Sequence, residues 1–303
     1  MGAVINVGGP TGLPTIQAGI NAAVDGDTVL VANGTYSGAG NRNIDFGGKL
    51  ITLTSQGDPT KCIIDGGKAA RGFIFSTKET RLAKVIGFTI RNCDGKAAGG
   101  LGGDGGAFLI NEASPVISRC IIKSNSASSG GAMRITGSRA VISNCLFVSN
   151  TATQRGGAIS LKPQASNPTF LNCTMTGNTA PASGGGAISS ELLLGKGVKA
   201  TVTNCILWGN SAPEIKGVII GGVTTVVVTF SDVKQKIVGK GNIGIAPGFV
   251  SDTNPRLKPT SACIDAGSNA AAAKPVDLGG NRRIRDGNGD GIATVDMGAF
   301  ELQ

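Results

Sequence analysis

Apolar and polar residues alternate in a pattern that repeats four times through the middle of the chain. Residues 105–125, 130–150, 156–178 and 185–210 each open with Gly-Gly-Ala and continue through short runs of period-two alternation. Such runs, separated by Gly, Asn or Ser, predict short β-strands joined by tight turns rather than helices. Each unit also contains a cysteine followed five residues later by an asparagine, at Cys120 and Asn125, Cys145 and Asn150, Cys173 and Asn178, and Cys205 and Asn210.

The repeat aligns like residues in columns, which predicts a solenoid with one coil per unit. Coils stacked about 4.8 Å apart bury a continuous core, so the predicted fold is all-β, a right-handed single-stranded parallel β-helix. The columns expected to face inward are Phe108, Met133, Ile159 and Ile188, then Ile110, Ile135 and Leu161, then Ile122, Phe147, Met175 and Leu207. The residues expected to face outward between them are Leu109, Arg134, Ser160 and Ser189.

Less regular segments flank the four repeats. Residues 13–23 have an amphipathic pattern that predicts a short helix, which would cap the open N-terminal end of the core. Further strands are expected over 27–31, 49–54, 62–65, 72–75 and 85–91. We expect one domain over residues 1–303, with an N-terminal cap over 1–26, coils over 27–235 and a C-terminal cap or anchor-like segment over 236–303.

The amino-acid composition excludes several classes of protein and of functional site. The 303 residues include 49 Gly but only 12 Pro and no Gly-X-Y period, which excludes collagen and places glycine at coil corners. The chain has no histidine, which excludes Ser-His-Asp and Cys-His nucleophiles and His-ligated metals. Aromatic residues make up only 4%, which argues against platforms that stack sugars or bases. The string 99–106 resembles a phosphate-binding loop, but no helix pattern follows it; we expect no nucleotide, haem or zinc.

Several segments resemble known β-helix proteins. Residues 14–36, PTIQAGINAAVDGDTVLVANGTY, resemble the N-terminal coil of pectate-lyase-like and pectinesterase-like proteins. The Gly-Gly-Ala units with Phe-x-x-Asn endings are similar to repeats of polymorphic outer-membrane proteins. Residues 241–267 and 276–301 are similar to the tails of secreted bacterial β-helix proteins that end in a choice-of-anchor segment. The resemblance implies the fold and an extracellular, periplasmic or cell-surface location, but no single activity, because this fold carries lyases, esterases, hydrolases, epimerases and adhesins.

The cysteine and asparagine columns each allow two interpretations. Stacked thiols could form a metal or redox device, but a column is a line, whereas zinc needs ligands that converge on one point. We therefore interpret the cysteines as buried thiols that pack like small hydrophobes. Alignment of residues 87–90 on the repeat places Phe88, and not Cys93, in that column. The asparagines are interpreted as a ladder whose amides bond to neighbouring coils, with glycan binding as the alternative.

An acidic loop near the C-terminus resembles a calcium site. Asp286, Asn288 and Asp290, followed by a glycine, match positions 1, 3, 5 and 6 of a calcium loop, where oxygen ligands lie on alternate residues. Position 12 of such a loop carries a carboxylate, but this chain has Met297 there, with Asp296 one place earlier. We expect Asp286, Asn288, Asp290 and Asp296 to hold a stabilising Ca²⁺; the alternative is a solvated turn.

Charge is distributed unevenly along the chain. The 28 Lys and Arg against 19 Asp and Glu give a net charge of +9, and their single, scattered positions argue against nucleic acid as a partner. Residues 113–190 contain no Asp or Glu; Asp104, Glu112 and Glu191 flank this stretch singly. That arrangement argues against the paired carboxylates of a hydrolase. Cations in the stretch could bind a uronate-rich or sulfated polyanion, and the candidates are Arg119, Lys123, Arg134, Arg155 and Lys162.

Two functional classes follow from these observations. The first is an exported or surface β-helix protein with a non-catalytic binding or structural role towards acidic polysaccharide or a cell-surface glycan. The second is a polysaccharide lyase, in which a Lys or Arg would act as the base while another Arg neutralises a uronate carboxylate. Arg134, beside Lys123 or Arg155, is the catalytic candidate. The missing histidine and carboxylate pairs favour the first class, and charges that only aid solubility are the alternative to both.

Overall fold

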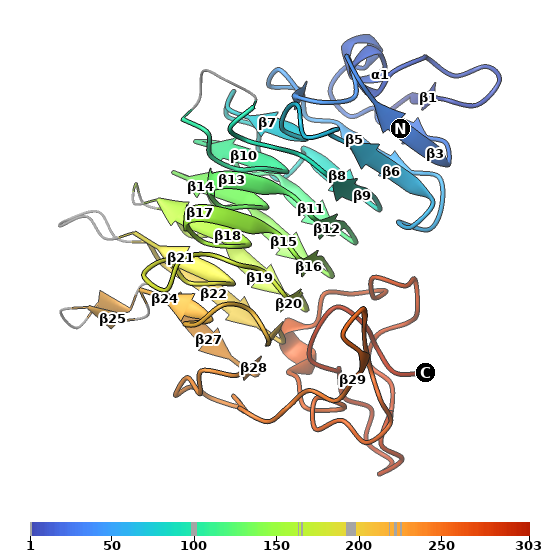
Figure 1. The fold of residues 1–303 in the computed structure, drawn as a ribbon. Helices are drawn as coiled ribbons and strands as arrows, with labels where there is room; N and C mark the ends of the chain where they lie inside the picture. The colour runs from blue at the N-terminus through green and yellow to red at the C-terminus, as the bar shows by residue number, and fades with distance from the viewer. Residues whose placement is uncertain are drawn as a thin grey trace.

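The computed structural model describes residues 2–97, 102–162, 164, 166–191, 198–217, 219–220, 223–224 and 226–303. The described chain winds as a solenoid in which strands of successive coils pair in parallel and form three long sheets, A, B and C (Figure 1). The predicted right-handed parallel β-helix is confirmed. No helix in this described part of the chain is long and apolar enough to cross a membrane.

The sheets are given in spatial order from the N-terminal end. Sheet A contains β1 (Val4–Val7), β2 (Thr28–Val31), β5 (Thr52–Ser55), β8 (Lys84–Ile86), β11 (Val116–Ser118), β15 (Val141–Ser143), β19 (Thr169–Leu171), β22 (Ala200–Thr203) and β27 (Val226–Thr229). Sheet B contains β3 (Gly34–Ser37), β6 (Cys62–Asp65), β9 (Thr89–Arg91), β12 (Ile121–Lys123), β16 (Leu146–Val148), β20 (Thr174–Thr176), β23 (Ile206–Leu207) and β28 (Asp232–Val233). Sheet C contains β4 (Ile44–Asp45), β7 (Phe73–Phe75), β10 (Phe108–Asn111), β14 (Met133–Thr136), β18 (Ile159–Lys162), β21 (Ile188–Ser190) and β24 (Ile215–Lys216).

Smaller elements lie outside the three sheets. A helix, α1 (Ile16–Ala22), packs on β1, β2 and β4 at the N-terminal end of the stack, as the amphipathic pattern predicts (Figure 1). Gly19 in α1 permits this contact, because a Cβ there would lie 2.4 Å from the Val7 side chain. The remaining elements are β13 (Ser126–Ser129), β17 (Thr151–Arg155), β25 (Ile219–Ile220), β26 (Val223–Thr224), β29 (Phe249–Ser251), β30 (Asn254–Leu257) and the 3-10 helix η1 (Asn269–Ala271).

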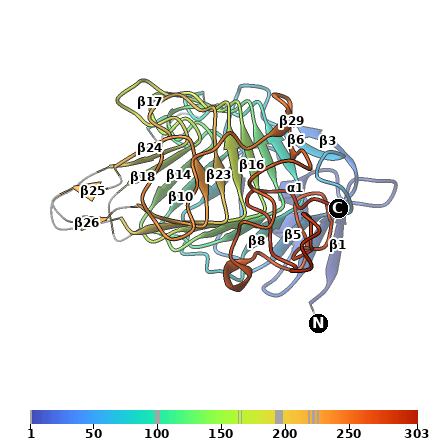
Figure 2. The same cartoon turned by 90° about the horizontal axis from the view of Figure 1, so that it is seen from below.

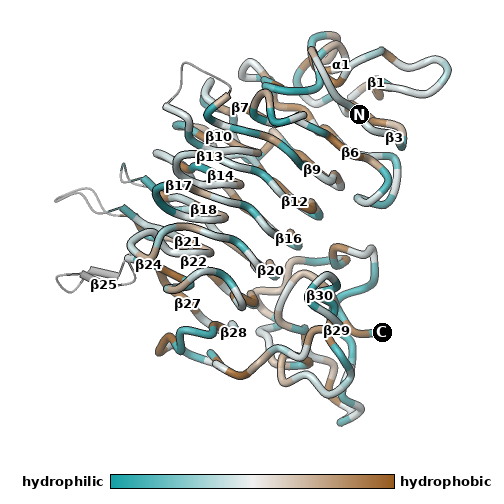
Figure 3. The backbone as a smooth tube through the Cα atoms, viewed as in Figure 1, coloured by the Kyte–Doolittle hydropathy of each residue, from teal (hydrophilic) through white to brown (hydrophobic). Residues whose placement is uncertain are grey.

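The inward columns pair in the expected register. Phe108 lies opposite Met133, which lies opposite Ile159 and then Ile188, and all four are fully buried. The column from Ile122 to Leu207 on sheet B stacks in the same way. Hydrophobic positions recur from coil to coil along the stack in Figure 3. One expected strand differs: residues 85–91 form β8 and β9, because Gly87 turns the chain between them with a φ of 85°.

The predicted cysteine and asparagine columns are both present. All seven cysteines are free and buried, and Phe88 stands between the Cys62 and Cys120 levels of the column. Burial raises the pKa of the Cys62 thiol to about 12, so this thiol stays protonated and is a poor nucleophile at neutral pH. The asparagine side chains bond one to the next along the stack, with Nδ2–Oδ1 distances of 2.7–2.9 Å, in the order Asn125, Asn150, Asn178 and Asn210.

The C-terminal segment, residues 240–303, lies against the side of the solenoid as well as near its end. It lies on the opposite side from β25 in both views (Figures 1 and 2). Its Leu278, Ala299 and Phe300 pack on outward apolar residues of β12 and β16. The segment also bonds to the amides of three corner residues, each of which immediately precedes a column cysteine: Asn144, Asn172 and Asn204.

Candidate functional site

The five predicted polyanion-binding residues fall on two sides of the solenoid. Arg134 and Lys162 belong to sheet C, and Arg155, at the end of β17, shares Glu191 with Arg134. Arg119 and Lys123 lie at the β11–β12 corner and on sheet B. Consecutive strands of one coil belong to different faces, so closeness in sequence does not place these cations in one stripe. Arg134 therefore lies beside Arg155, one of the two neighbours expected, but not beside Lys123.

Arg134 is held in an ion-pair cluster. Its Nη1 lies 2.6 Å from Glu191 Oε1, and its Nε lies 3.5 Å from Asp104 Oδ2. The Ser160 hydroxyl on the next coil contacts the same guanidinium. Only 6% of the Arg134 side chain is exposed. The residue points away from the core as expected, but it is covered rather than free, and two carboxylates occupy the guanidinium that a lyase would need as its base.

The fold brings together the two acids that flank the acid-free stretch. Asp104 precedes the first Gly-Gly-Ala unit and Glu191 follows β21, yet both contact Arg134. Arg155 also reaches Glu191, at 3.4 Å. Asp104 and Glu191, which flank the acid-free stretch singly in the sequence, therefore share one arginine in the fold. The two acids occupy non-equivalent positions of the repeat, so the sequence pattern carried no signal for this meeting.

Accessible cations border this cluster. Strand pairing aligns Arg134, Ser160, Ser189 and Lys216 across successive coils of sheet C. Lys216 and Lys162 are exposed, and 42% of the Arg155 side chain is accessible. Within the described ranges, neither lysine takes part in an ion pair. This side of the solenoid therefore presents positive charge around Arg134, whose own charge is neutralised by Glu191 and Asp104.

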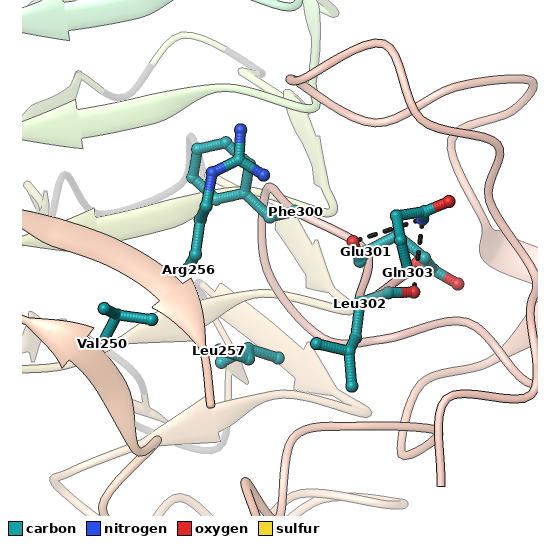
Figure 4. Close-up of a pocket in the computed structure, with 7 residues that line it drawn as sticks. All are labelled: Val250, Arg256, Leu257, Phe300, Glu301, Leu302 and Gln303. Atoms are coloured by element: carbon teal, nitrogen blue, oxygen red, sulfur yellow. Dashed lines mark hydrogen bonds between the residues drawn. The ribbon is translucent and has the colours of Figure 1, made fainter. Parts of the chain in front are cut away.

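A second arrangement, which the sequence reasoning missed, lies in the C-terminal segment. The Arg256 guanidinium stands 4.3 Å from the centre of the Phe300 ring (Figure 4). Beside it is a cavity of about 200 Å³. The low aromatic content argues against platforms that stack sugars or bases, but a single ring is sufficient to stack against a guanidinium. The residues that line the cavity are Val250, Arg256, Leu257, Phe300, Glu301, Leu302 and Gln303.

Comparison with known proteins identifies the family. The family model described as "Right handed beta helix region" matches residues 71–242. The chain belongs to this family. Among solved structures, a pectate lyase, Pel9A, is similar with 15% identity and a TM-score of 0.43 over 99% of this chain and 96% of that one. A pectin methylesterase variant in complex with a hexasaccharide is similar with 14% identity and a TM-score of 0.38 over 85% of this chain and 94% of that one.

No curated protein matches this β-helix chain. The two structural similarities do not bear on its activity. The resemblances to polymorphic outer-membrane repeats and to anchor segments stay predictions.

Of the glycine string at 99–106, Gly99, Gly100 and Leu101 lie outside the described residues. Gly106 packs against the next coil, since a Cβ there would lie 2.2 Å from a backbone oxygen of Gly131.

The predicted calcium ligands of the β-helix protein lie in two environments. Asp286, Asn288 and Asp290 form an exposed turn, in which the Asp286 carboxylate accepts N–H bonds from residues 289–291. Asp296 is buried and accepts from the backbone of Asp265 and Leu302, and burial raises its pKa to about 7. Among the described residues, no group of three or more His, Cys, Asp or Glu is arranged to hold a metal ion.

The calcium interpretation stays a prediction with a direct test. If the loop binds Ca²⁺, millimolar Ca²⁺ should raise the melting temperature of the protein, and EDTA should lower it. Asp286→Ala should remove that calcium response, because position 1 of the loop supplies a ligand. Melting curves that are identical with Ca²⁺ and with EDTA would show that the loop is only a hydrogen-bonded turn.

Proposed function

We propose that this β-helix protein binds acidic polysaccharide without turning it over, on the side of sheet C. The observation that carries the proposal is the arrangement of Arg155, Lys162 and Lys216, accessible cations around a centre where Arg134 is already neutralised. Arg155 and Lys162 lie on one coil, and Lys216 lies two coils further along the stack. Coils repeat about every 4.8 Å, so the two coil steps from Lys162 to Lys216 span about 10 Å, and an extended anionic chain can contact both lysines. Attraction of this kind is long-ranged and is weakened by salt.

Two further features support binding. The five ion pairs among the described residues engage four arginines, while the chain has 28 Lys and Arg in all. Among the residues that the structure describes, most lysines and arginines therefore form no ion pair within the chain. Arg155 can also contribute a planar guanidinium, which suits carboxylate and sulfate groups. Binding of such a polymer fits a protein that acts outside the cell, and we place it there as part of the same proposal.

The test measures retention on immobilised polygalacturonate, alginate and heparin along a salt gradient. The double variant Lys162→Ala/Lys216→Ala should bind about tenfold more weakly than the parent and elute at lower salt, because each exposed cation contributes up to about 1 kcal/mol. Lys234→Ala/Lys258→Ala is the matched control, since it removes two exposed lysines elsewhere and should change retention little.

Two results would contradict the proposal. Equal elution of the two double variants would show that the side of sheet C is not the binding face. Appearance of an unsaturated, ultraviolet-absorbing product during incubation with these polymers would show that the protein is a lyase. Such turnover would need a base other than Arg134, whose guanidinium is held by Glu191 and Asp104.

A further inference from the structure

The cavity in the C-terminal segment combines apolar walls with a positioned cation. Val250, Leu257 and Leu302 supply aliphatic surface, and Phe300 and Arg256 complete the opposite side (Figure 4). The volume of about 200 Å³ is below that of sites for drug-sized ligands. It has room for one ring-sized body and not for a polymer chain. Small-molecule sites have this composition, with a mostly apolar lining and few polar groups that fix orientation.

Arg256 is held in place but has no acceptor. Its guanidinium lies over the Phe300 ring, and stacking of this kind restrains a flexible side chain. In the part of the chain that the structure describes, no side-chain hydrogen bond or ion pair of Arg256 is found. The residue is exposed at the end of β30. Its donors are therefore available to an anion that enters the cavity.

Two acids near Arg256, Glu301 and Asp277, are bonded to other groups. Glu301 lines the cavity, but its carboxylate accepts bonds from Arg283 and from the backbone of Ile284. The Asp277 oxygens accept from the backbone of Asn281 and Glu301. Neither carboxylate forms an ion pair with Arg256, so the cavity keeps a positive charge.

A second arginine approaches the same place. Arg119 reaches from the solenoid towards the Gly279–Gly280 turn, where a Cβ on Gly280 would lie 3.5 Å from its Nη2. On the other side of the turn, a Cβ on Gly279 would lie 3.0 Å from Arg256 Nη2. The two glycines thus leave room for both guanidinium groups. Arg119 Nε is itself buried without a hydrogen-bond partner, which adds unsatisfied positive potential to this region.

We propose that this cavity binds a compact organic carboxylate, with its apolar ring against Val250, Leu257 and Leu302 and its carboxylate on Arg256. A planar guanidinium can donate two parallel hydrogen bonds to a carboxylate. The aliphatic walls favour a ring without many hydroxyl groups, because burying an unpaired hydroxyl is costly. This site lies in the C-terminal segment and is separate from the cations of sheet C.

Benzoate and its neutral analogue benzamide are suitable probes, titrated into the full chain and followed by NMR. Benzoate should bind saturably, and benzamide should bind at least tenfold more weakly, because it lacks the charge that Arg256 recognises. Arg256→Gln should weaken benzoate binding about tenfold or more. Arg256→Lys should lose part of the affinity, since it keeps the charge but not the planar donors. Arg282→Gln, an exposed neighbour in the same segment, should bind like the parent.

The outcomes separate this proposal from polysaccharide binding. Lys162→Ala/Lys216→Ala should leave benzoate affinity unchanged, whatever it does to retention on acidic polymers. Absence of saturable benzoate binding to the parent protein would overturn the carboxylate site. Equal affinity for benzoate and benzamide, or an Arg256→Gln variant that binds like the parent with an unchanged melting temperature, would also overturn it.

Discussion

Replacing Asn178 with alanine is expected to lower the free energy of unfolding by about 4 kcal/mol, because several buried groups lose their partners at once. Asn178 Oδ1 accepts from the backbone N–H of Asn150 at 3.0 Å and from its Nδ2 at 2.9 Å. Asn178 Nδ2 donates to the Phe147 carbonyl at 3.0 Å and to Asn210 Oδ1 at 2.7 Å. The side chain is fully buried, so water cannot replace these bonds.

The effect should exceed that of a single lost hydrogen bond, because the ladder is continuous. It begins where the Cys93 N–H donates to Asn125 Oδ1, since Cys93 occupies the asparagine position of its coil. It ends where Asn210 Nδ2 donates to a buried Glu214 carboxylate, 2.6 Å away. Aligned amide dipoles polarise one another in a low-dielectric interior. An alanine in the middle divides one chain of bonds into two shorter ones.

Chemical denaturation of the parent and the variant measures this loss. Thr179→Ala is the matched control, because its hydroxyl bonds to Thr151 on the exposed side of the same corner. Such a surface change should cost less than about 0.5 kcal/mol. If Asn178→Ala costs no more than Thr179→Ala, the ladder does not stabilise the stack, and the repeated asparagines would need another role.

The repeats made the solenoid interior predictable. Each inward-facing position could be predicted because it recurs at the same place in every unit. Stacking of the coils then brings these equivalent positions into contact. The same logic placed Phe88 in the cysteine column and gave the asparagines their structural role. Periodicity carries this information because each coil contacts mainly its two neighbours.

Contacts between non-equivalent positions were not predictable in this way. Asp104 and Glu191 meet on Arg134 from opposite ends of the acid-free stretch. The C-terminal segment returns to the side of sheet B, where its bonds to Asn144 join residues far apart in sequence. These partners do not occupy equivalent positions of the repeat, so the sequence pattern does not predict that they lie opposite each other. For the same reason, Arg256 was not recognised as a neighbour of Phe300.

The second large effect is expected where that segment docks. Replacing Arg283 with methionine should lower the free energy of unfolding by about 3–5 kcal/mol, because it leaves a buried carboxylate unpaired. Arg283 Nη1 lies 2.9 Å from Glu301 Oε2, with at most 1% of either side chain exposed. Its Nε and Nη2 donate to Asn144 Oδ1 on the solenoid. The Arg283 guanidinium thus links two parts of the C-terminal segment, through Glu301, and links that segment to the coils, through Asn144.

The loss should also depend on pH. Burial raises the pKa of Glu301, although Arg283 opposes this change, and burial raises the pKa of the adjacent Asp296 to about 7. A carboxyl with a raised pKa holds its proton more tightly in the folded chain, so its contribution to stability falls as pH rises from the unfolded value of 3.8 towards 7. Without the Arg283 cation, the pKa of Glu301 rises further, so the loss of stability with rising pH becomes larger. The deficit of Arg283→Met should therefore be smaller at pH 5 than at pH 8.

Denaturation at both pH values tests this linkage, with Arg282→Met as the matched control, because Arg282 is the exposed neighbour. The double variant Arg283→Met/Glu301→Gln removes both charges, and the single amide oxygen can keep the bond from the Ile284 N–H, while the bond from the Asp296 N–H to the other carboxylate oxygen is lost. It should recover part of the stability that Arg283→Met loses, since no unpaired charge remains. If the two substitutions simply add, or if the deficit is the same at both pH values, the arginine acts through packing alone and the docking does not depend on the buried ion pair.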